Sequence, residues 1–463
     1  MRQNNDTINN TISNTIVVIG AGPVGLAAAA HLIARGLTPI VLEKGQSVGS
    51  AMLEWGQVRV FTPWKYLVDS AVEKLLNKTD WQYPDKEHMP TGREIVEQYL
   101  VPAATNTQLE STIIYGAEVV AVAKNNLSKS SSNNRDETGY TVHFKTQGGQ
   151  YHSVESDAVI DASGTWHNPN PIGLDGLPVP GERENQAVIR YGIPDVRFQQ
   201  KVDYMNKRTL VLGGGHSAIN VVLDLLKLQE TNPNTKIHWG LRTNNLEKLL
   251  GGGLNDQLPA RGELGLAAKR AIESGALTLL TPLKVHSITR TESGVSVENS
   301  VEGVIDTLEI DRIIVSAGFR PNLDILRELR LDIDEVVEAP SKLAPLIDPN
   351  LHSCGTVKPH GVMELSHHDK NFFVVGMKSY GRAPTFLMLT GYEQVRSISA
   401  ELAGDHEAAR RVELILPKTG VCSTKKSNAG CCEIALPGSE SESESCCSAP
   451  RGTKEKSSTS CCG

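Results

Sequence analysis

The order of apolar and polar positions predicts two βαβ units, one near the start of the chain and one in its middle. Residues 16–20 form a short apolar run, residues 24–35 are rich in alanine and leucine, and residues 38–42 are apolar again. This order predicts a strand, a helix capped by Gly36, and a second strand. Residues 209–212, a helical stretch that extends to about residue 228, and residues 236–240 repeat it.

Further apolar segments predict the rest of an α/β fold. Strands are expected at residues 140–144, 158–160, 312–315 and 371–375, and a helix from about residue 385 to residue 402. Thr91 and Glu94 have the spacing of a capping box, which predicts that a helix begins there and continues to residue 100. Residues 125–137 are rich in serine and asparagine and predict a hairpin loop.

The turn between the first predicted strand and helix has the sequence Gly20-x-Gly22-x-x-Gly25. Gly20 permits a tight turn, Gly22 lets the backbone approach a pyrophosphate, and Gly25 lets the helix pack closely on the strand. The helix N-terminus favours an anion. Glu43 ends the second strand, 18 residues after Gly25, where a carboxylate binds ribose hydroxyls. This context predicts a dinucleotide site; the alternative is a glycine-rich turn without a ligand.

A second motif, Gly213-x-Gly215-x-x-Ala218, follows the predicted strand at residues 209–212. Ala218 is small enough to take the packing role of the third glycine. The next strand ends without an acid, and Arg242 follows it. An arginine at this place suits the 2′-phosphate of NADPH, which an acid would repel. NADPH is therefore favoured over NADH, and the alternative is that Arg242 is an ordinary surface charge.

With two such sites in this order, the chain resembles the superfamily of flavin-containing monooxygenases and pyridine-nucleotide oxidoreductases over about residues 14–405. Residues 161–164 and 316–322 look like the two crossings between the domains. Residues 372–376 with 383–389 look like the segment that closes over the flavin, and residues 54–64 resemble the region that lines it. The alternative for the aromatic residues of this last region is plain core packing. The resemblance implies FAD contacts at Gly20, Gly22, Pro23, Gly25, Glu43, Lys44, Trp55, Arg59, Val119, Ala162, Gly376 and Thr385, and NADPH contacts at Gly213, Gly215, His216, Ser217, Ala218, Arg242, Ala317 and Gly318.

The fold class implied by this resemblance is α/β, with two Rossmann-like, three-layer dinucleotide-binding domains. The FAD-binding domain, residues 15–165 and 325–412, is split around an NADPH-binding domain, residues 166–324. Residues 1–14 and 413–463 are expected to be flexible. In the C-terminal segment, the composition changes after about residue 416 to Ser, Lys, Glu, Gly and Cys. Such a composition buries too little apolar surface to offset the entropy of ordering.

The chain departs from the superfamily in two places. Disulfide reductases of this kind carry a cysteine pair shortly after the acid that corresponds to Glu43, or in the NADPH-binding domain, and neither is found here. The Phe-x-Gly-x-x-x-His signature of many flavin monooxygenases is also missing. Its counterpart contains Asn185 and Arg190. The first departure argues against disulfide chemistry beside the flavin, and the second against ordinary amine N-oxygenation and Baeyer–Villiger chemistry.

Charge and composition exclude several partner classes. The formal net charge is −7, without a basic stripe, which argues against nucleic acid. No apolar run approaches the roughly 20 residues that span a bilayer, and the polar first 15 residues lack the apolar segment of a secretory signal. The expected location is the cytoplasm, where thiols stay reduced.

Seven of the eight cysteines lie in the last 42 residues, and six of these form three adjacent pairs spaced 15 residues apart: Cys431, Cys432, Cys446, Cys447, Cys461 and Cys462. Adjacent Cα atoms are about 3.8 Å apart, which is shorter than the roughly 4.4–6.8 Å of ordinary disulfides. A pair should therefore remain a dithiol, and two neighbouring thiolates suit a soft ion better than a structural zinc site. The alternative is an incidental low-complexity terminus.

The cysteine pairs, together with the dinucleotide sites, give the chain a resemblance to flavoprotein monooxygenases of arsenic-resistance operons. This resemblance implies that trivalent arsenicals, arsenite or methylarsenite, are oxidised with NADPH, FAD and molecular oxygen. Three alternatives stay open: an NADPH-dependent reductase of a soft metal ion or disulfide, a monooxygenase of another sulfur or nitrogen nucleophile, and a metalloid-sequestering protein with an idle flavin. The sequence identifies no catalytic side chain.

The last expectations concern a glycine-rich segment, one cysteine outside the pairs and two adjacent histidines. The glycine-rich residues 251–265 are not expected to form a simple helix. They predict either a loop over the nicotinamide, with Arg261 on a phosphate, or a long connector. Cys354 is interpreted as a core thiol, with receipt of arsenic as the alternative, and His367 and His368 are expected at the surface.

Overall fold

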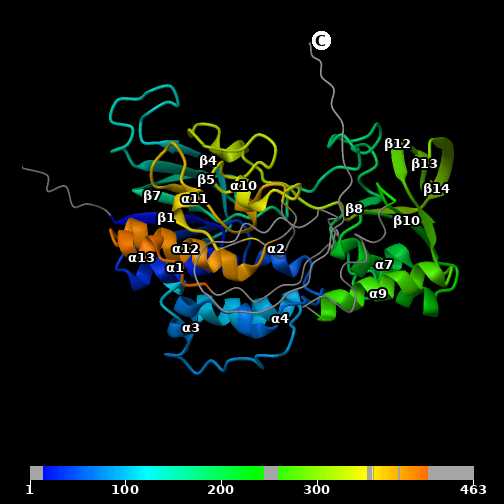
Figure 1. Cartoon of the computed structure of the whole chain (residues 1–463), viewed down its shortest axis with the longest axis horizontal. Coiled ribbons are helices and arrows are strands. Elements are labelled where there is room, and N and C mark those ends of the chain that lie inside the picture. Colours follow the sequence, from blue (N-terminus) through cyan, green and yellow to red (C-terminus); the bar gives the residue numbers. More distant parts are fainter. Residues whose placement is uncertain (1–13, 245–258, 352–356, 358, 384–385, 415–463) are drawn as a thin grey trace, which may run out of the picture. The chain divides into compact units, whose positions relative to one another are not determined.

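The structure is a computed structural model that describes residues 14–244, 259–351, 357, 359–383 and 386–414 (Figure 1). Within these residues the first sheet has five parallel strands in the order β16-β7-β1-β2-β3. The strands are β1 (Thr15–Ile19), β2 (Thr38–Glu43), β3 (Ile113–Tyr115), β7 (Ala158–Asp161) and β16 (Phe372–Val374). Because β16 comes from the far end of the chain, the chain returns to this sheet after building a second one.

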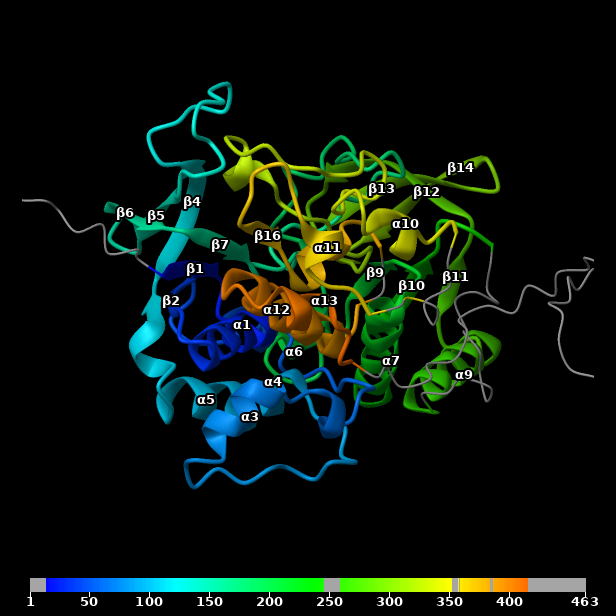
Figure 2. The same cartoon turned by 60° about the vertical axis from the view of Figure 1, so that its left-hand side comes forward.

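The first sheet is buried on both faces, as the nearly continuous apolar run of β1 requires. Ile16 and Val18 pack with the helices α1 (Pro23–Ala34) and α12 (Met388–Leu402), which lie side by side in both Figure 1 and Figure 2. Val17 and Ile19 point to the other face, where they pack against an antiparallel sheet of β4 (Ala117–Lys124), β5 (Tyr140–Thr146) and β6 (Tyr151–Ser156). The result is a three-layer arrangement.

The second sheet repeats this plan. Its parallel strands, in the order β11-β10-β9-β15-β8 within the described ranges, are β8 (Ile189–Tyr191), β9 (Arg208–Leu212), β10 (Lys236–Gly240), β11 (Thr278–Leu280) and β15 (Arg312–Val315). Val211 packs with α7 (His216–Thr231), which lies beside β9 and β10 in Figure 2. Leu210 and Leu212 pack against an antiparallel sheet of β12 (Leu283–Arg290), β13 (Val295–Val301) and β14 (Val304–Ile310).

Two segments connect the sheets, and they run next to each other. Asn170, in the segment that leaves β7, donates its backbone N–H to the carbonyl oxygen of Gly318, in the segment that leaves β15, at 3.0 Å. The Asn170 side chain also donates to Ala317 O at 3.1 Å. These contacts agree with the predicted pair of crossings.

Local signals in the sequence explain where the main helices begin and end. α1 begins at Pro23, whose missing N–H costs nothing in the first turn, and its run of alanines is buried from Ala27 to Ala30. Gly36 follows the helix with a φ of +75° and donates to Ile33 O at 3.0 Å, which confirms the predicted cap.

The capping box is also confirmed. Glu94 N donates to the Thr91 hydroxyl at 3.2 Å, and Thr91 N donates to the Glu94 carboxylate at 2.6 Å. The helix is not regular as far as residue 100: α4 (Gly92–Ile95) leads through a wider π-helical turn, Val96–Leu100, into α5 (Val101–Thr105). Pro102 lacks the N–H that would complete the regular ladder at this point. The other helices are α2 (Ser50–Leu53), α3 (Ser70–Leu76), α6 (Lys201–Tyr204), α9 (Pro259–Glu273), α10 (Ala344–Ile347), α11 (Val362–Leu365) and α13 (His406–Arg410).

Two predictions are wrong. Residues 251–265 are not free of regular helix, because α9 begins at Pro259 and contains Gly262 and Gly265. A proline at the first helical position favours this start, and each glycine costs the helix only about 1 kcal/mol. His367 is buried at 9% exposure instead of lying at the surface, because it packs against Phe372 of the sheet; His368 is exposed, as expected.

Candidate functional site: two glycine-rich cradles

The first glycine-rich turn follows β1 and leads into α1. Gly22 precedes the helix in an extended conformation, and a β-carbon on Gly22 would have no atom within 4 Å. The space above this residue is therefore free for a ligand, which is what a pyrophosphate on the helix N-terminus needs. Pro23 and Val24 begin the helix, and its first turn contains no acid that would repel an anion.

The other two glycines of this motif are needed for packing. A β-carbon on Gly25 would lie 1.9 Å from the carbonyl oxygen of Gly20, so no larger residue fits there. Gly20 has a φ of +96°, and its own β-carbon would lie 3.0 Å from Ala162 O. Ala162 belongs to the predicted first crossing, so the turn is held between α1 and that crossing.

Glu43 lies at the end of β2 and is 7% exposed. Its carboxylate accepts hydrogen bonds from Ala21 N at 2.7 Å, Gly45 N at 2.7 Å and the Ser50 hydroxyl at 2.6 Å. The acid therefore lies directly beside the glycine-rich turn, where a ribose acceptor is expected. The neighbouring Lys44 is exposed and pairs with Glu118 at 2.7 Å, which commits its ammonium group to β4.

The turn of Gly20, Gly22 and Gly25, with the start of α1, is called the first cradle. Other residues predicted for FAD are spread around it. Gly376 follows β16 with a φ of +67°, and its β-carbon would lie 3.4 Å from Val24 of α1. The segment after β16 thus passes over the start of the helix, as the resemblance implies. Val119 is half-buried in β4 and packs against the core between the antiparallel layer and the first sheet. Thr385 lies outside the described residues.

Trp55 and Arg59 are positioned by α4 rather than by the glycine-rich turn. The Trp55 ring covers Gly92, where a β-carbon would lie 2.7 Å from it. Arg59 is exposed, donates to Met89 O and lies 3.9 Å from the Glu94 carboxylate. Whether these two side chains contact FAD stays a prediction.

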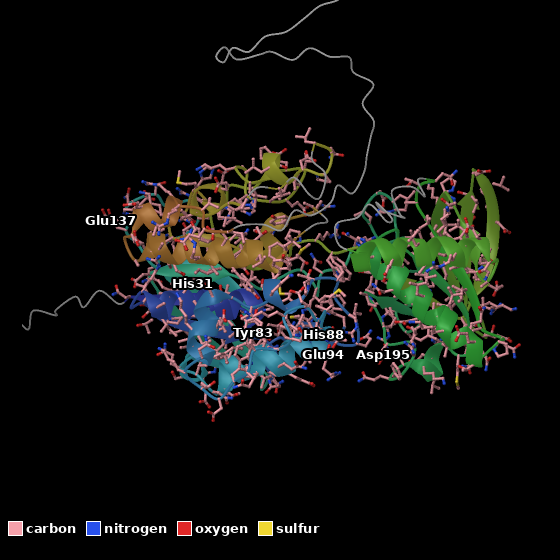
Figure 3. The ribbon with its side chains drawn as sticks, turned by 60° about the horizontal axis from the view of Figure 1, so that its bottom comes forward. His31, Tyr83, His88, Glu94, Glu137 and Asp195 are labelled. Carbon is pink, nitrogen blue, oxygen red and sulfur yellow. The ribbon has the colours of Figure 1, made fainter. Side chains whose placement is uncertain are left out.

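His88 completes a small charged cluster with Arg59 and Glu94. It lies 3.7 Å from Glu94, and Figure 3 shows the two side chains next to each other. Burial raises the pKa of Glu94, but hydrogen bonds from Thr91 and the charges of Arg59 and His88 outweigh it and lower that pKa overall. The carboxylate of Glu94 therefore stays ionised at the start of α4.

The second glycine-rich turn has the same division of roles. Gly215 is exposed, and a β-carbon there would have no neighbour within 4 Å. Gly213 has a φ of +142° and faces Ser316 O. A β-carbon added to Gly213 would also lie 3.4 Å from the β-carbon of Ala218. This cradle also fits a pyrophosphate. The indole of Trp239 in β10 fixes the turn by donating to Gly213 O at 2.9 Å.

The remaining residues predicted for NADPH border this second turn. His216 begins α7, and its ring lies 5.4 Å from that of Phe61. Ser217 is half-buried and Ala218 is fully buried. Ala317 and Gly318 follow β15, and Arg242 is exposed two residues after β10. The parallel strands β9, β10 and β15 all end near the turn, which is where open α/β sheets bind ligands.

Sequence reasoning missed two side-chain groups near the crossings. The Lys378 ammonium lies 2.6 Å from Asp161, which ends β7. Glu54 accepts hydrogen bonds from the Trp166 indole at 2.8 Å and pairs with His167 at 2.9 Å. The signal available was Asp161 itself, an acid at the end of an otherwise apolar strand, but its partner lies 217 residues away in the sequence.

Several predictions fall outside the described residues: the six paired cysteines, Cys354, and the side chain of Arg261. Within the described ranges, no group of three or more His, Cys, Asp or Glu side chains could hold a metal ion. Across the same ranges, no helix is long and apolar enough to cross a lipid bilayer.

Comparison with known proteins agrees with the two cradles. The family model described as pyridine nucleotide-disulphide oxidoreductase matches residues 17–354. A flavin-containing monooxygenase of Aspergillus flavus, ustF1, is 27% identical over 45% of this chain and 50% of its own length. A ferredoxin–NADP reductase of Thermus thermophilus is 24% identical over 74% of this chain and 84% of its own. The chain spans about half the length of the curated monooxygenases that it matches.

Solved structures show the same fold. The bacillithiol disulfide reductase Bdr (YpdA) of Bacillus cereus superposes with a TM-score of 0.61 at 18% identity, covering 84% of this chain and 98% of its own. The two parallel sheets, each carrying a glycine-rich turn, are the parts expected of such enzymes. The chain therefore belongs to the pyridine nucleotide-disulphide oxidoreductase family and is an oxidoreductase that uses FAD and NADPH.

Proposed function

We propose that this protein is an FAD-dependent, NADPH-using monooxygenase that oxidises trivalent arsenicals, arsenite or methylarsenite, to pentavalent forms. The observation that carries the proposal is the set of three adjacent cysteine pairs, at 431–432, 446–447 and 461–462, which repeat every 15 residues. Two neighbouring thiolates bind a soft, thiophilic centre well. In this proposal the pairs capture the arsenical before its oxidation. The proposed location is the cytoplasm, because thiols stay reduced there.

The first cradle is the proposed FAD site, within a domain of residues 15–165 and 325–412. Gly22 leaves room for the pyrophosphate, and Glu43 lies beside the turn for the ribose. The second cradle, within residues 166–324, is the proposed NADPH site, with Gly215 below the pyrophosphate and Arg242 beyond β10 for the 2′-phosphate. When bound, the two cofactors supply hydride transfer and oxygen activation, while the protein supplies their orientation and excludes water.

The proposed reaction balances with molecular oxygen as the co-substrate. Arsenite, oxygen, NADPH and a proton give arsenate, NADP⁺ and water. The lone pair on arsenic forms the new bond to one oxygen atom, and the other oxygen atom leaves as water. The pentavalent product is less thiophilic and would leave a cysteine pair more readily.

Two observations support an oxygenase over a disulfide reductase. Residues 1–353 contain no cysteine, so no redox-active cysteine pair can lie in the sequence around either glycine-rich turn. Flavin-containing monooxygenases are among the curated relatives, each matched over part of its length.

The test is oxygen consumption by the purified full-length protein with NADPH, measured with arsenite, methylarsenite and a thioether side by side. The proposal expects uptake above background with an arsenical, and conversion of that arsenical to its pentavalent form. Oxygen uptake that stays at the background rate with both arsenicals would contradict it.

The role of the cysteine pairs is tested with a variant in which all six paired cysteines are serine. Cys422→Ser is the matched control, because this cysteine precedes the first pair by nine residues in the sequence and has no cysteine next to it. The proposal expects the six-serine variant to raise the KM for the arsenical by about 10-fold or more, since a dithiol is a much better ligand than a diol for a soft centre. The control should keep the original KM. Equal KM values in the variant and the control would remove the capture role.

A second candidate is an NADPH-dependent reductase of a soft metal ion or a disulfide, with the cysteine pairs as an internal dithiol. The same pairs favour it, because a dithiol can pass electrons as well as bind metal. Anaerobic turnover of NADPH with a soft metal ion or a disulfide, together with no arsenical-dependent oxygen uptake, would select this candidate.

A further inference from the structure

A fully buried ion pair lies beside the first glycine-rich turn. Lys378 belongs to the 3₁₀ turn Gly376–Tyr380, and its side chain is 1% exposed. Its Nζ lies 2.6 Å from Oδ2 of Asp161, which ends β7 and is 0% exposed. Buried charges of this kind are rare unless they are paired, so the two residues depend on each other.

Ser163 joins the pair to the predicted first crossing. Its backbone N–H and its hydroxyl donate to Asp161 Oδ1 at 3.0 Å and 2.6 Å, and its hydroxyl accepts from Lys378 Nζ at 3.0 Å. Both carboxylate oxygens of Asp161 are therefore used. The acid fixes the turn that follows β7, while Lys378 cancels the charge that this arrangement introduces.

The pair flanks the place where the first cradle would hold a pyrophosphate. A β-carbon on Gly20 would lie 3.2 Å from Cα of Ser163, and one on Gly376 would lie 3.4 Å from Val24 at the start of α1. A pyrophosphate is a dianion, and α1 offers it only the partial positive charge of a helix N-terminus. An unpaired Asp161 at this position would oppose that attraction.

We propose that Lys378 is an electrostatic positioning residue, which makes the Asp161 carboxylate compatible with the FAD pyrophosphate next to it. The inference rests on the proposed placement of FAD in the first cradle. Its consequence is an asymmetry: removing either charge disturbs the fold, but the two removals act in opposite directions on FAD affinity. A purely structural pair would instead weaken FAD binding in both cases.

The test compares Lys378→Met, Asp161→Asn and the double variant, each as full-length apoprotein. FAD affinity is measured by fluorescence titration and stability by urea unfolding. Asp161→Asn isolates the electrostatic effect, because the amide that replaces the carboxylate keeps an acceptor for Ser163 while the charge is removed. Lys378→Met should raise the Kd for FAD about 10-fold or more. Asp161→Asn should lower it about 10-fold, because the Lys378 ammonium is then no longer neutralised, and the double variant should return close to the original value.

A rise in the Kd for FAD in both single variants would overturn the inference. If Lys378→Met does not fold, the comparison of Asp161→Asn with the double variant remains, because neither contains an unpaired buried carboxylate. In a protein that already carries Asp161→Asn, the further substitution Lys378→Met should raise the Kd for FAD about 10-fold. Equal Kd values for FAD in these two proteins would again overturn the inference. An error in the placement of FAD is recognised separately, because Gly22→Val would then retain its flavin.

Discussion

A β-carbon on Gly213 would lie 2.2 Å from the carbonyl oxygen of Ser316, so the second glycine-rich turn passes directly against the end of β15. Gly215, two residues later, has open space at the same position. The two glycines therefore serve different purposes. Gly213 is required by the protein itself, whereas Gly215 leaves room for a ligand.

This difference gives a prediction for the second cradle. Gly215→Val should fold and bind FAD normally, but it should lose NADPH binding because the new side chain fills the ligand's space. Gly213→Ala should instead lower the free energy of unfolding by about 1–3 kcal/mol, through the clash and the φ of +142°. Calorimetric titration with NADPH and urea unfolding separate the two outcomes. Undiminished NADPH binding by Gly215→Val would contradict the placement of NADPH at the second glycine-rich turn.

The first cradle has a matching pair of substitutions. Gly22→Val should purify as a folded but colourless protein, since the φ of −77° at Gly22 is acceptable for valine and no protein atom is in its way. Gly25→Ala should be destabilised, because its β-carbon would lie 1.9 Å from Gly20 O. The measurement is flavin absorbance per mole of protein, with circular dichroism as the control for folding. A yellow Gly22→Val protein would refute the placement of FAD.

Local sequence patterns predicted both turns because each depends on neighbouring residues: a strand, spaced glycines and a helix. Gly36, the capping box at Thr91 and the strand at 312–315 were predictable for the same reason. The pair of Asp161 and Lys378 was not, because it joins residues that come together only when β16 returns to the first sheet. The burial of His367 was missed for the same reason, since its neighbour Phe372 is buried by that return.

Arg242 is predicted to determine the choice between the two nicotinamide cofactors. It is exposed, so Arg242→Ala should fold normally. A hydrogen bond to a charged phosphate contributes about 1.5–3 kcal/mol, so the substitution should weaken NADPH binding about 10-fold or more and leave NADH almost unaffected. Steady-state KM values with both cofactors check this. Equal losses for NADPH and NADH would remove the proposed contact with the 2′-phosphate.

His367 predicts an acid-sensitive step in stability. Burial lowers the pKa of this histidine to about 4, and its Nε2 has no hydrogen-bond partner among the described residues. The unfolded chain binds this proton near pH 6.5 but the folded one does not, so stability falls as the pH drops from about 6.5 to about 4, by about 3 kcal/mol in total. His367→Gln should lose the part of this pH dependence that comes from His367. Its urea midpoint should therefore fall less between pH 7 and pH 5 than that of the original protein. The same fall in both proteins would assign it to other groups.

The most direct test of the central claim is anaerobic mixing of the purified yellow protein with NADPH while the absorbance of oxidised flavin is followed. Two cradles that bring the cofactors together predict rapid bleaching with NADPH, no bleaching in Gly215→Val, and recovery of the colour when oxygen is admitted. A protein that is purified colourless and cannot be reconstituted with FAD, or whose flavin is not reduced by NADPH, would contradict the account.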